Sequence, residues 1–406
     1  MLEYNFDHVM KIVYCLNSIR FLGGIQRVTT VKANALAEIP GNEVYVVVTD
    51  NKAGPAIHEL SPKVHLIDLD INYYDRNQER SMLTNLIVGM AKGIPHKKAL
   101  KRTLRQINPD IVVSVGMSEK YMLTSMKRRT WKIIREFHSE KNYRSKHARS
   151  LFKKVQGKVS DFYEFHYADK KFDRIVVLTD EDKETNWQGW SNVSVMPNPV
   201  AFKCDTPSDL RDKTVISMGR LEPVKNFSSL ISAFQIVAQR HPDWTLKIYG
   251  DGSLKGSLQK QINESGLQDN VSLMGFSSDM KNVLRQSSIF AFSSLVEGFA
   301  LVIVEAMECG LPVISYQCSC GPKDIITNGK DGFLVPVNDE QMFADKICDL
   351  IEDENLRRQI SYAARVRAQH YHVENIAQQW MDLFNEVMGI RHEAGNNGNT
   401  NNWVGQ

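Results

Sequence analysis

The segment from Glu297 to Glu305 places two carboxylates eight positions apart in the run Glu-Gly-Phe-Ala-Leu-Val-Ile-Val-Glu. An apolar stretch before it predicts a buried strand, and the glycine followed by apolar residues predicts a turn into a helix. Free amides at a helix N-terminus attract anionic oxygens, and paired carboxylates accept hydrogen bonds from vicinal hydroxyls. The segment suits a phosphorylated sugar, although two glutamates on a solvated surface are the simpler interpretation of the spacing alone.

Arg220 and Lys225 supply the opposite charge in the loop Gly-Arg-Leu-Glu-Pro-Val-Lys, which follows a predicted strand at 215–218. An arginine binds phosphate through its planar fork, and a lysine acts as a point charge. Together they could hold a diphosphate, although two cations on a surface loop are the simpler interpretation of this loop alone.

The elements that must position these residues form two series. Strands are expected at 11–16, 44–49, 111–115, 132–135 and 174–178, and again at 215–218, 244–249, 271–274, 289–293 and 312–316. Helical patterns between them favour parallel sheets, so we expect an α/β protein with two Rossmann-like doubly wound domains. The Pro-Asn-Pro stretch at 197–199 separates an N-terminal domain at 1–197 from a C-terminal domain at 198–373. A terminal helix at 374–389 is expected to pack back on the first domain, and the Asn- and Gly-rich residues 391–406 are expected to be disordered.

Taken in order, the motifs resemble glycosyltransferase family 4, whose members have the GT-B fold, with a cleft between the two domains, and retain anomeric configuration. The resemblance rests on Gly23-Gly24-Ile-Gln-Arg27, Arg220 with Lys225, Gly250-Asp-Gly252, Gly275-Phe276, Glu297–Glu305, Gly321-Pro322 and Gly332-Phe-Leu-Val-Pro336. The motifs follow one another in the family's order over nearly all of the second domain, and the double glycine extends the similarity to the first domain. Gln26, Ser139 and Asp324 depart from the family's usual residues, which leaves the acceptor and the sugar preference open.

The resemblance implies a role for each matched residue. Arg220 and Lys225 would neutralise the donor diphosphate, Glu305 would bind the ribose hydroxyls, and Glu297 would contact the transferred sugar. Residues that would line the donor site are Gly24, Phe276, Gly298, Phe299, Ala300 and Leu301. His138 matches a cleft histidine of the family, although a lone histidine is more often structural.

No metal ion or other cofactor is expected for the transfer. Asp68-Leu-Asp70 and Asp180-Glu-Asp182 fit the Asp-x-Asp string of metal-dependent transferases, but both lie in the first domain, away from the predicted diphosphate site. Cys318 and Cys320 lack a second ligand pair for zinc. The implied donor is a nucleotide-diphosphate sugar, with UDP favoured. The implied acceptor is a saccharide or lipid-linked saccharide of bacterial surface glycans such as capsule or lipopolysaccharide.

Three alternative activities fit a similar cleft. They are a GT-B sugar-nucleotide epimerase, a non-catalytic sugar-nucleotide binding protein and a dinucleotide-dependent oxidoreductase, the last disfavoured because Gly23-Gly24 lacks the Gly-x-Gly-x-x-Gly spacing.

Charge and hydropathy place the chain in the cytoplasm, with contact at the inner face of the membrane as an option. No apolar run reaches the roughly 18 to 20 residues needed to span a bilayer, and the N-terminus lacks a signal-peptide pattern. Residues 127–174 hold 15 Lys and Arg against 6 Asp and Glu, an excess of 15 − 6 = 9. This basic stretch fits a solvated helical surface, an anionic lipid surface or a phosphorylated acceptor. Nucleic acid is not expected, because no nucleic-acid motif accompanies the charge.

Overall fold

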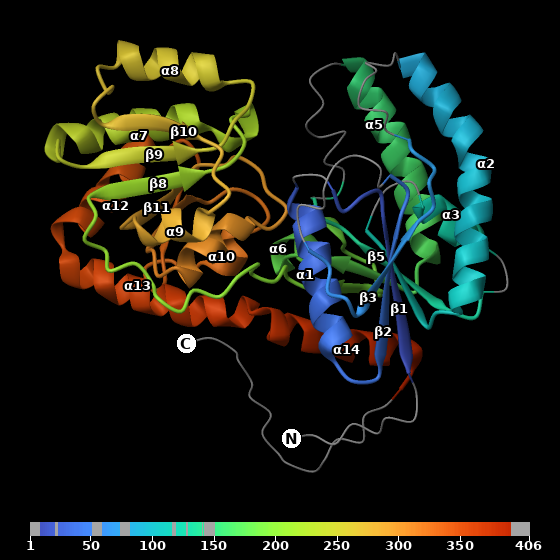
Figure 1. The fold of residues 1–406 in the computed structure, drawn as a ribbon. Helices are drawn as coiled ribbons and strands as arrows, with labels where there is room; N and C mark the ends of the chain where they lie inside the picture. Colours follow the sequence, from blue (N-terminus) through green and yellow to red (C-terminus); the bar gives the residue numbers. More distant parts are fainter. Residues whose placement is uncertain are drawn as a thin grey trace.

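The computed structural model describes residues 9–20, 23–50, 59–73, 82–115, 119–126, 129–139, 141 and 151–390. Side chains within 82–90, 151–153 and 167–168 are not described. The predicted disorder of 391–406 lies outside these residues. Within them, two parallel sheets of seven and six strands lie side by side, each with helices around it (Figure 1).

The first sheet has the order β3-β2-β1-β4-β5-β6-β7, with every pair parallel. Its strands are β1 (Met10–Leu16), β2 (Asn42–Val48), β3 (Val64–Asp68), β4 (Ile111–Ser114), β5 (Lys132–Glu136), β6 (Arg174–Val177) and β7 (Val193–Val195). Its helices are α1 (Gly24–Glu38), α2 (Met82–Ile107), α3 (Lys120–Ser125), α5 (Leu151–Tyr163) and α6 (Asp180–Asn186). The central strands are buried apolar runs, as a sheet covered on both faces requires.

The second sheet has the order β10-β9-β8-β11-β12-β13 and is also parallel. Its strands are β8 (Thr214–Met218), β9 (Thr245–Tyr249), β10 (Val271–Gly275), β11 (Ile289–Phe292), β12 (Val313–Tyr316) and β13 (Phe333–Val335). Its helices are α7 (Phe227–Arg240), α8 (Lys255–Glu264), α9 (Met280–Arg285), α10 (Leu301–Glu308), α11 (Pro322–Ile325), α12 (Glu340–Glu352) and α13 (Glu354–Ala368). Two doubly wound sheets confirm the predicted α/β fold class.

Three strands escaped the sequence analysis, and all three are short or partly exposed. β3 has a single buried residue, Val64, and β7 and β13 have three residues each with one buried. Because these strands lack a continuous buried run, their apolar pattern is too weak to predict. β3, β7, β10 and β13 form the sheet edges, where one side of the backbone needs no strand partner.

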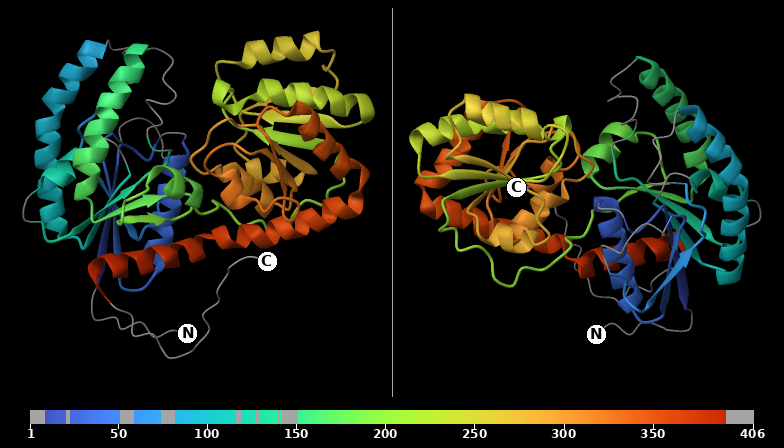
Figure 2. Two further views of the ribbon diagram at one scale, coloured as in Figure 1. Left: turned by 180° about the vertical axis from the view of Figure 1, so that it is seen from behind. Right: turned by 45° about the horizontal axis from the view of Figure 1, so that its top comes forward.

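The last helix, α14 (Val373–Met388), connects the two halves of the chain. It leaves the second domain and lies along the first, as Figures 1 and 2 show. Trp380 and Phe384, both fully buried, join the core that β1, β2 and α1 form. Helix α14 therefore stabilises the N-terminal domain through apolar burial. Burial of each large apolar side chain contributes about 1.5 to 3 kcal/mol to the free energy of unfolding.

A reciprocal pair of contacts fixes α6 of the first domain against the start of α11 in the second. The Asp324 carboxylate accepts hydrogen bonds from the backbone N–H of Asp180 at 2.7 Å and of Glu181 at 3.3 Å. In return, the Glu181 carboxylate accepts from the N–H of Cys320 at 2.8 Å and pairs with Lys323 at 3.0 Å. Asp324, which departs from the family's usual residue at this position, thus caps a helix of the opposite domain.

Candidate functional site

Lys225 and Glu297 meet at the carboxyl edge of the second sheet. The Lys225 Nζ donates to Glu297 Oε1 at 2.5 Å, and the two side chains are 19% and 14% exposed. Two hydrogen bonds to backbone carbonyls hold the two loops together. Ser293 Oγ donates to the Lys225 carbonyl at 2.8 Å, and the Leu295 N–H donates to the Val224 carbonyl at 2.8 Å. The family resemblance assigns Lys225 to the diphosphate and Glu297 to the sugar; in the structure the two side chains form an ion pair with each other.

Arg220 stands in the same loop and is exposed. Its side chain forms no hydrogen bond or ion pair with any residue that the structure describes. The loop is held close to the next strand end, because the Gly219 N–H donates to the Tyr249 carbonyl at 2.9 Å. A Cβ on Gly250 would overlap the carbonyl oxygen of Gly219, which explains the glycine at that position. The guanidinium is thus presented on a fixed backbone with its donors available.

The start of α10 presents backbone amides beside this loop. Ala300 caps the helix with a left-handed backbone (φ 63°, ψ 51°), an uncommon conformation for a non-glycine residue. Phe299 is 4% exposed and packs edge-on against Tyr371 at 5.6 Å, which anchors the turn. The amides of Phe299, Ala300 and Leu301 therefore form the positive end of a short helix.

Glu305 lies one turn further along α10 and is fully buried, at 1% exposure. Arg27 of α1, in the first domain, donates from its Nη2 to Glu305 Oε1 across the domain boundary. Burial raises the pKa of Glu305, and the Arg27 guanidinium opposes that rise. Arg27 entered the sequence analysis only as the last residue of a motif, because a partner 278 positions away leaves no local signal.

Gly298 and His138 form a second contact across the boundary. A Cβ on Gly298 would overlap the backbone carbonyl oxygen of His138 and would come within 3.3 Å of the Ser139 Cα. Glycine is therefore the residue that lets the α10 turn approach the loop after β5. The structure brings the predicted His138 to the donor-site segment, with its backbone at the contact.

The His138 ring points into the first domain. Its Nε2 lies 3.4 Å from Glu136 Oε1, and Glu136 is paired with the buried Lys32 of α1. Burial is the main cause that lowers the pKa of His138, to about 4. The ring is therefore neutral at pH 7, and the Lys32–Glu136 pair lies directly behind it.

Two further predicted donor-site residues face open space. Phe276, directly after β10, is 69% exposed. Gly24 begins α1, and a Cβ added to it would meet no atom within 4 Å. No protein contact therefore requires glycine at 24, and the family-based reason, room for the donor, stays a prediction.

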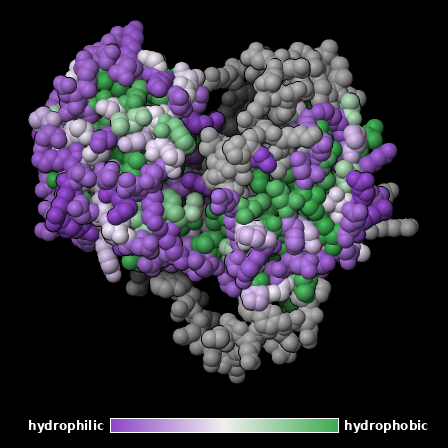
Figure 3. Space-filling view, in the orientation of Figure 1, coloured by the Kyte–Doolittle hydropathy of each residue, from purple (hydrophilic) through white to green (hydrophobic). Residues whose placement is uncertain are grey.

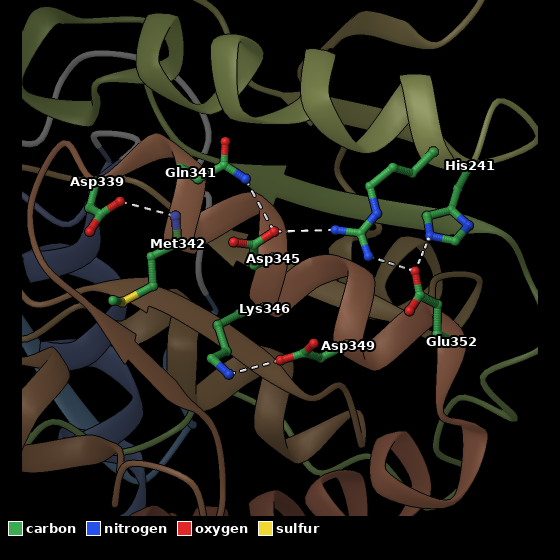
Figure 4. Close-up of polar contacts among 9 residues, drawn as sticks. His241, Asp339, Gln341, Met342, Asp345, Lys346, Asp349 and Glu352 are labelled. Atoms are coloured by element: carbon green, nitrogen blue, oxygen red, sulfur yellow. Dashed lines mark hydrogen bonds and ion pairs between the residues drawn. The ribbon is translucent and has the colours of Figure 1, made fainter.

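One group among the described residues has the composition of a metal site: His241, Cys348 and Glu352, whose ligand atoms lie within 4.8 Å of one another. His241 Nε2 lies 2.9 Å from Glu352, as Figure 4 shows, and Arg240 donates to the same carboxylate at 2.8 Å. Burial, the main cause, raises the pKa of the Cys348 thiol to about 11. With a guanidinium on its carboxylate and a protonated thiol, the group is an ion-paired contact between α7 and α12.

The second domain is similar to a known protein family. Residues 202–367 match the family model described as "Glycosyl transferases group 1". This range contains Arg220, Lys225, Glu297 and Glu305, the charged residues described above.

Relatives and solved structures extend the match over both domains. An uncharacterized glycosyltransferase of Haemophilus influenzae is 26% identical over 377 residues, which cover 92% of this chain and 99% of the relative. An N-acetylgalactosamine-N,N'-diacetylbacillosaminyl-diphospho-undecaprenol 4-alpha-N-acetylgalactosaminyltransferase of Campylobacter jejuni is 32% identical over 169 residues, covering 42% of this chain and 46% of that protein. A crystal structure of S. aureus TarM with Fondaparinux, alpha-GlcNAc-glycerol and UDP has a TM-score of 0.73 at 15% identity, covering 93% of this chain and 100% of that chain.

Proposed function

We propose that this chain, a glycosyltransferase of the GT-B fold that carries a group 1 domain, moves a hexose or N-acetylhexosamine from a UDP-sugar to a saccharide or lipid-linked saccharide, with retention of configuration. The observation that carries the proposal is the convergence of Arg220, Lys225 and the α10 N-terminus on one edge of the second sheet. Ligands of open parallel sheets bind beyond this carboxyl edge.

The leaving group sets the electrostatic requirement. When the bond from the anomeric carbon to phosphate breaks, the diphosphate gains negative charge. Arg220 offers donors that no described residue occupies, and Lys225 adds a second cation that Glu297 holds in place. Fixed donors of this kind stabilise the transition state by about 3 to 4 kcal/mol each in other enzymes.

Retention is proposed to follow same-face attack. The acceptor hydroxyl forms its bond to the anomeric carbon on the face from which the diphosphate departs, and the departing phosphate oxygen takes the hydroxyl proton. Glu297 is already paired with Lys225, so we assign it to orienting the sugar and the lysine rather than to nucleophilic attack. A trapped glycosyl-Glu297 adduct would contradict this assignment.

The acceptor is proposed to be a sugar of a surface polysaccharide, presented free or on a lipid. The Campylobacter relative is named for a saccharide carried on diphospho-undecaprenol and for an alpha linkage. The TarM structure contains UDP, which supports UDP in the donor. Both assignments come to this chain by similarity and are tested below by its own turnover.

A membrane-facing surface is also proposed, but not on the predicted basic stretch as a whole. Arg129, Arg135 and Arg174 of that stretch pair with Asp173, with Glu164 and Asp169, and with Glu386. Among the described residues, no helix is both long and apolar enough to cross a bilayer. Contact with a membrane would therefore take place at a surface.

Helix α5 offers that surface. Four of its large apolar side chains lie on one stripe and are more than half exposed: Val155 (55%), Val159 (66%), Phe162 (56%) and Tyr163 (56%). Exposed lysines at 154 and 158 flank the stripe, and the neighbouring α2 adds exposed Lys97, Lys98 and Lys101 (Figures 1 and 2). Figure 3, in the orientation of Figure 1, shows hydrophilic residues over most of the near face of the second domain. Apolar side chains ringed by lysines suit the interface of an anionic bilayer.

The test is a screen of UDP- and GDP-sugars for donor hydrolysis, followed by transfer to saccharide acceptors in excess chelator. We expect turnover with a UDP-sugar, undiminished by the chelator, and a product with the donor's anomeric configuration. Product from donor alone with an inverted sugar stereocentre would identify an epimerase. UDP binding without turnover on any acceptor would favour a binding protein.

A further inference from the structure

We propose that Arg27 is a positioning residue that occupies the ribose carboxylate of the empty enzyme and must leave it when the donor binds. The proposal rests on the proposed function, because it takes Glu305 as the residue that receives the ribose hydroxyls. It adds a competition that the family motif does not contain: one domain of the protein takes the place of the nucleotide on the other.

Burial of Glu305 is the first step. The Glu305 side chain is 2% exposed, and the Arg27 side chain that forms an ion pair with it is 28% exposed. Two ribose hydroxyls that donate to a carboxylate need both of its oxygens within hydrogen-bond reach. In this conformation Arg27 occupies one of the two oxygens, so both can receive ribose hydroxyls only after Arg27 moves.

The electrostatics explain why a cation is needed while the site is empty. A buried carboxylate without a partner carries a large desolvation cost and tends to bind a proton. Burial raises the pKa of Glu305, and Arg27 acts against this rise by both charge and hydrogen bonding. Arg27 therefore favours the ionised carboxylate and holds it in place on α10 before the donor arrives.

The position of the pair couples it to the domain boundary. Arg27 lies on the first turn of α1, three residues after Gly24, and Glu305 lies on the helix whose entrance holds Gly298 against His138. The α6–α11 contact through Asp324 and Glu181 involves neither Arg27 nor Glu305. Release of Arg27 would therefore break one ion pair between the domains without requiring the loss of the Gly298–His138 or α6–α11 contacts.

The experiment measures binding of UDP and of 2',3'-dideoxy-UDP, which lacks both ribose hydroxyls, by isothermal titration calorimetry. The variants are Arg27→Gln, which keeps hydrogen-bonding capacity without charge, and Arg27→Lys, which keeps the charge. Removal of the competitor is expected to tighten UDP binding about tenfold in Arg27→Gln and to leave dideoxy-UDP within about twofold. Arg27→Lys is expected to stay close to wild type, and donor KM in Arg27→Gln is expected to fall while kcat does not rise.

Weaker or unchanged UDP binding in Arg27→Gln would overturn the proposal, as would equal tightening of both nucleotides. Glu305→Ala separates this failure from that of the proposed function. If Glu305→Ala weakens UDP but not dideoxy-UDP while Arg27→Gln has no effect, Glu305 still binds ribose and only the competition is wrong. If Glu305→Ala changes neither nucleotide, the ribose assignment itself fails.

Discussion

Gly298 lies directly against the backbone carbonyl of His138, with no room for a Cβ between the two domains. The atoms that an added Cβ would meet are backbone atoms of His138 and Ser139, so the close approach depends on glycine at position 298. It fixes how closely the turn before α10, the proposed donor site, approaches the loop that follows β5.

Gly298→Ala is expected to separate the two loops and to lower kcat/KM about 10²-fold, since a displacement of about 1 Å in a reacting geometry has that effect. Gly256→Ala in α8 is the matched control, because its added Cβ meets nothing within 4 Å. Steady-state kinetics of both variants would check the prediction. Equal activity of the two would show that the close approach does not matter for turnover.

Arg220→Ala is expected to reduce kcat by about 10² to 10³ with the free energy of unfolding unchanged within about 0.5 kcal/mol. The guanidinium is exposed and pairs with no described residue, so its removal costs the folded state little. Arg211→Ala, at an arginine whose side chain is 82% exposed, serves as control for loss of a charge. A loss of stability as large as the loss of activity would speak against a role in leaving-group stabilisation.

The free energy of unfolding should decrease as the pH is lowered, because the His138 ring is buried in the folded protein. The folded-state pKa of about 4 lies below the ordinary 6.5, so the unfolded chain binds the extra proton between these values. Acidification from pH 8 to pH 5 should therefore cost the wild type about 2 kcal/mol through this group, and His138→Asn should abolish that part. Urea unfolding at both pH values measures the difference.

His370→Asn is the control for that experiment, because His370 is exposed. If it changes the pH dependence as much as His138→Asn does, the buried ring is not the cause.

Val159→Glu combined with Phe162→Glu should lower binding to anionic vesicles at least about tenfold, because the stripe on α5 would lose apolar area and gain negative charge. Both residues are more than half exposed, so the fold should tolerate the changes. Val366→Glu, at an exposed valine of α13, tests whether any new surface charge has the same effect. Wild-type binding that ignores salt and lipid charge would remove the membrane proposal.

Sequence patterns predicted the fold better than the site. Buried strands such as β4 and β11 are predicted from continuous apolar runs. Helices α7 and α14 are predicted from apolar residues at helical spacing. The sequence also located Lys225 and Glu297 after predicted strands, but it did not predict that they form an ion pair with each other.

The sequence did not predict which residues form contacts between the two domains. Arg27 meets Glu305 over 278 positions, and Asp324 meets Asp180 over 144. The same limit applies to the basic stretch, where Arg135 proved to be buried among Glu164 and Asp169 rather than exposed to a partner. Such pairings depend on the packing of whole domains, which no local spacing encodes.

The most direct test of the account is calorimetric titration of UDP into the wild type and Glu305→Ala. The account predicts that wild type binds UDP and that Glu305→Ala binds it at least about tenfold more weakly, because two hydroxyls lose their acceptor. Equal UDP affinity in the two proteins would contradict the assignment of the Glu297–Glu305 segment to a nucleotide-sugar donor.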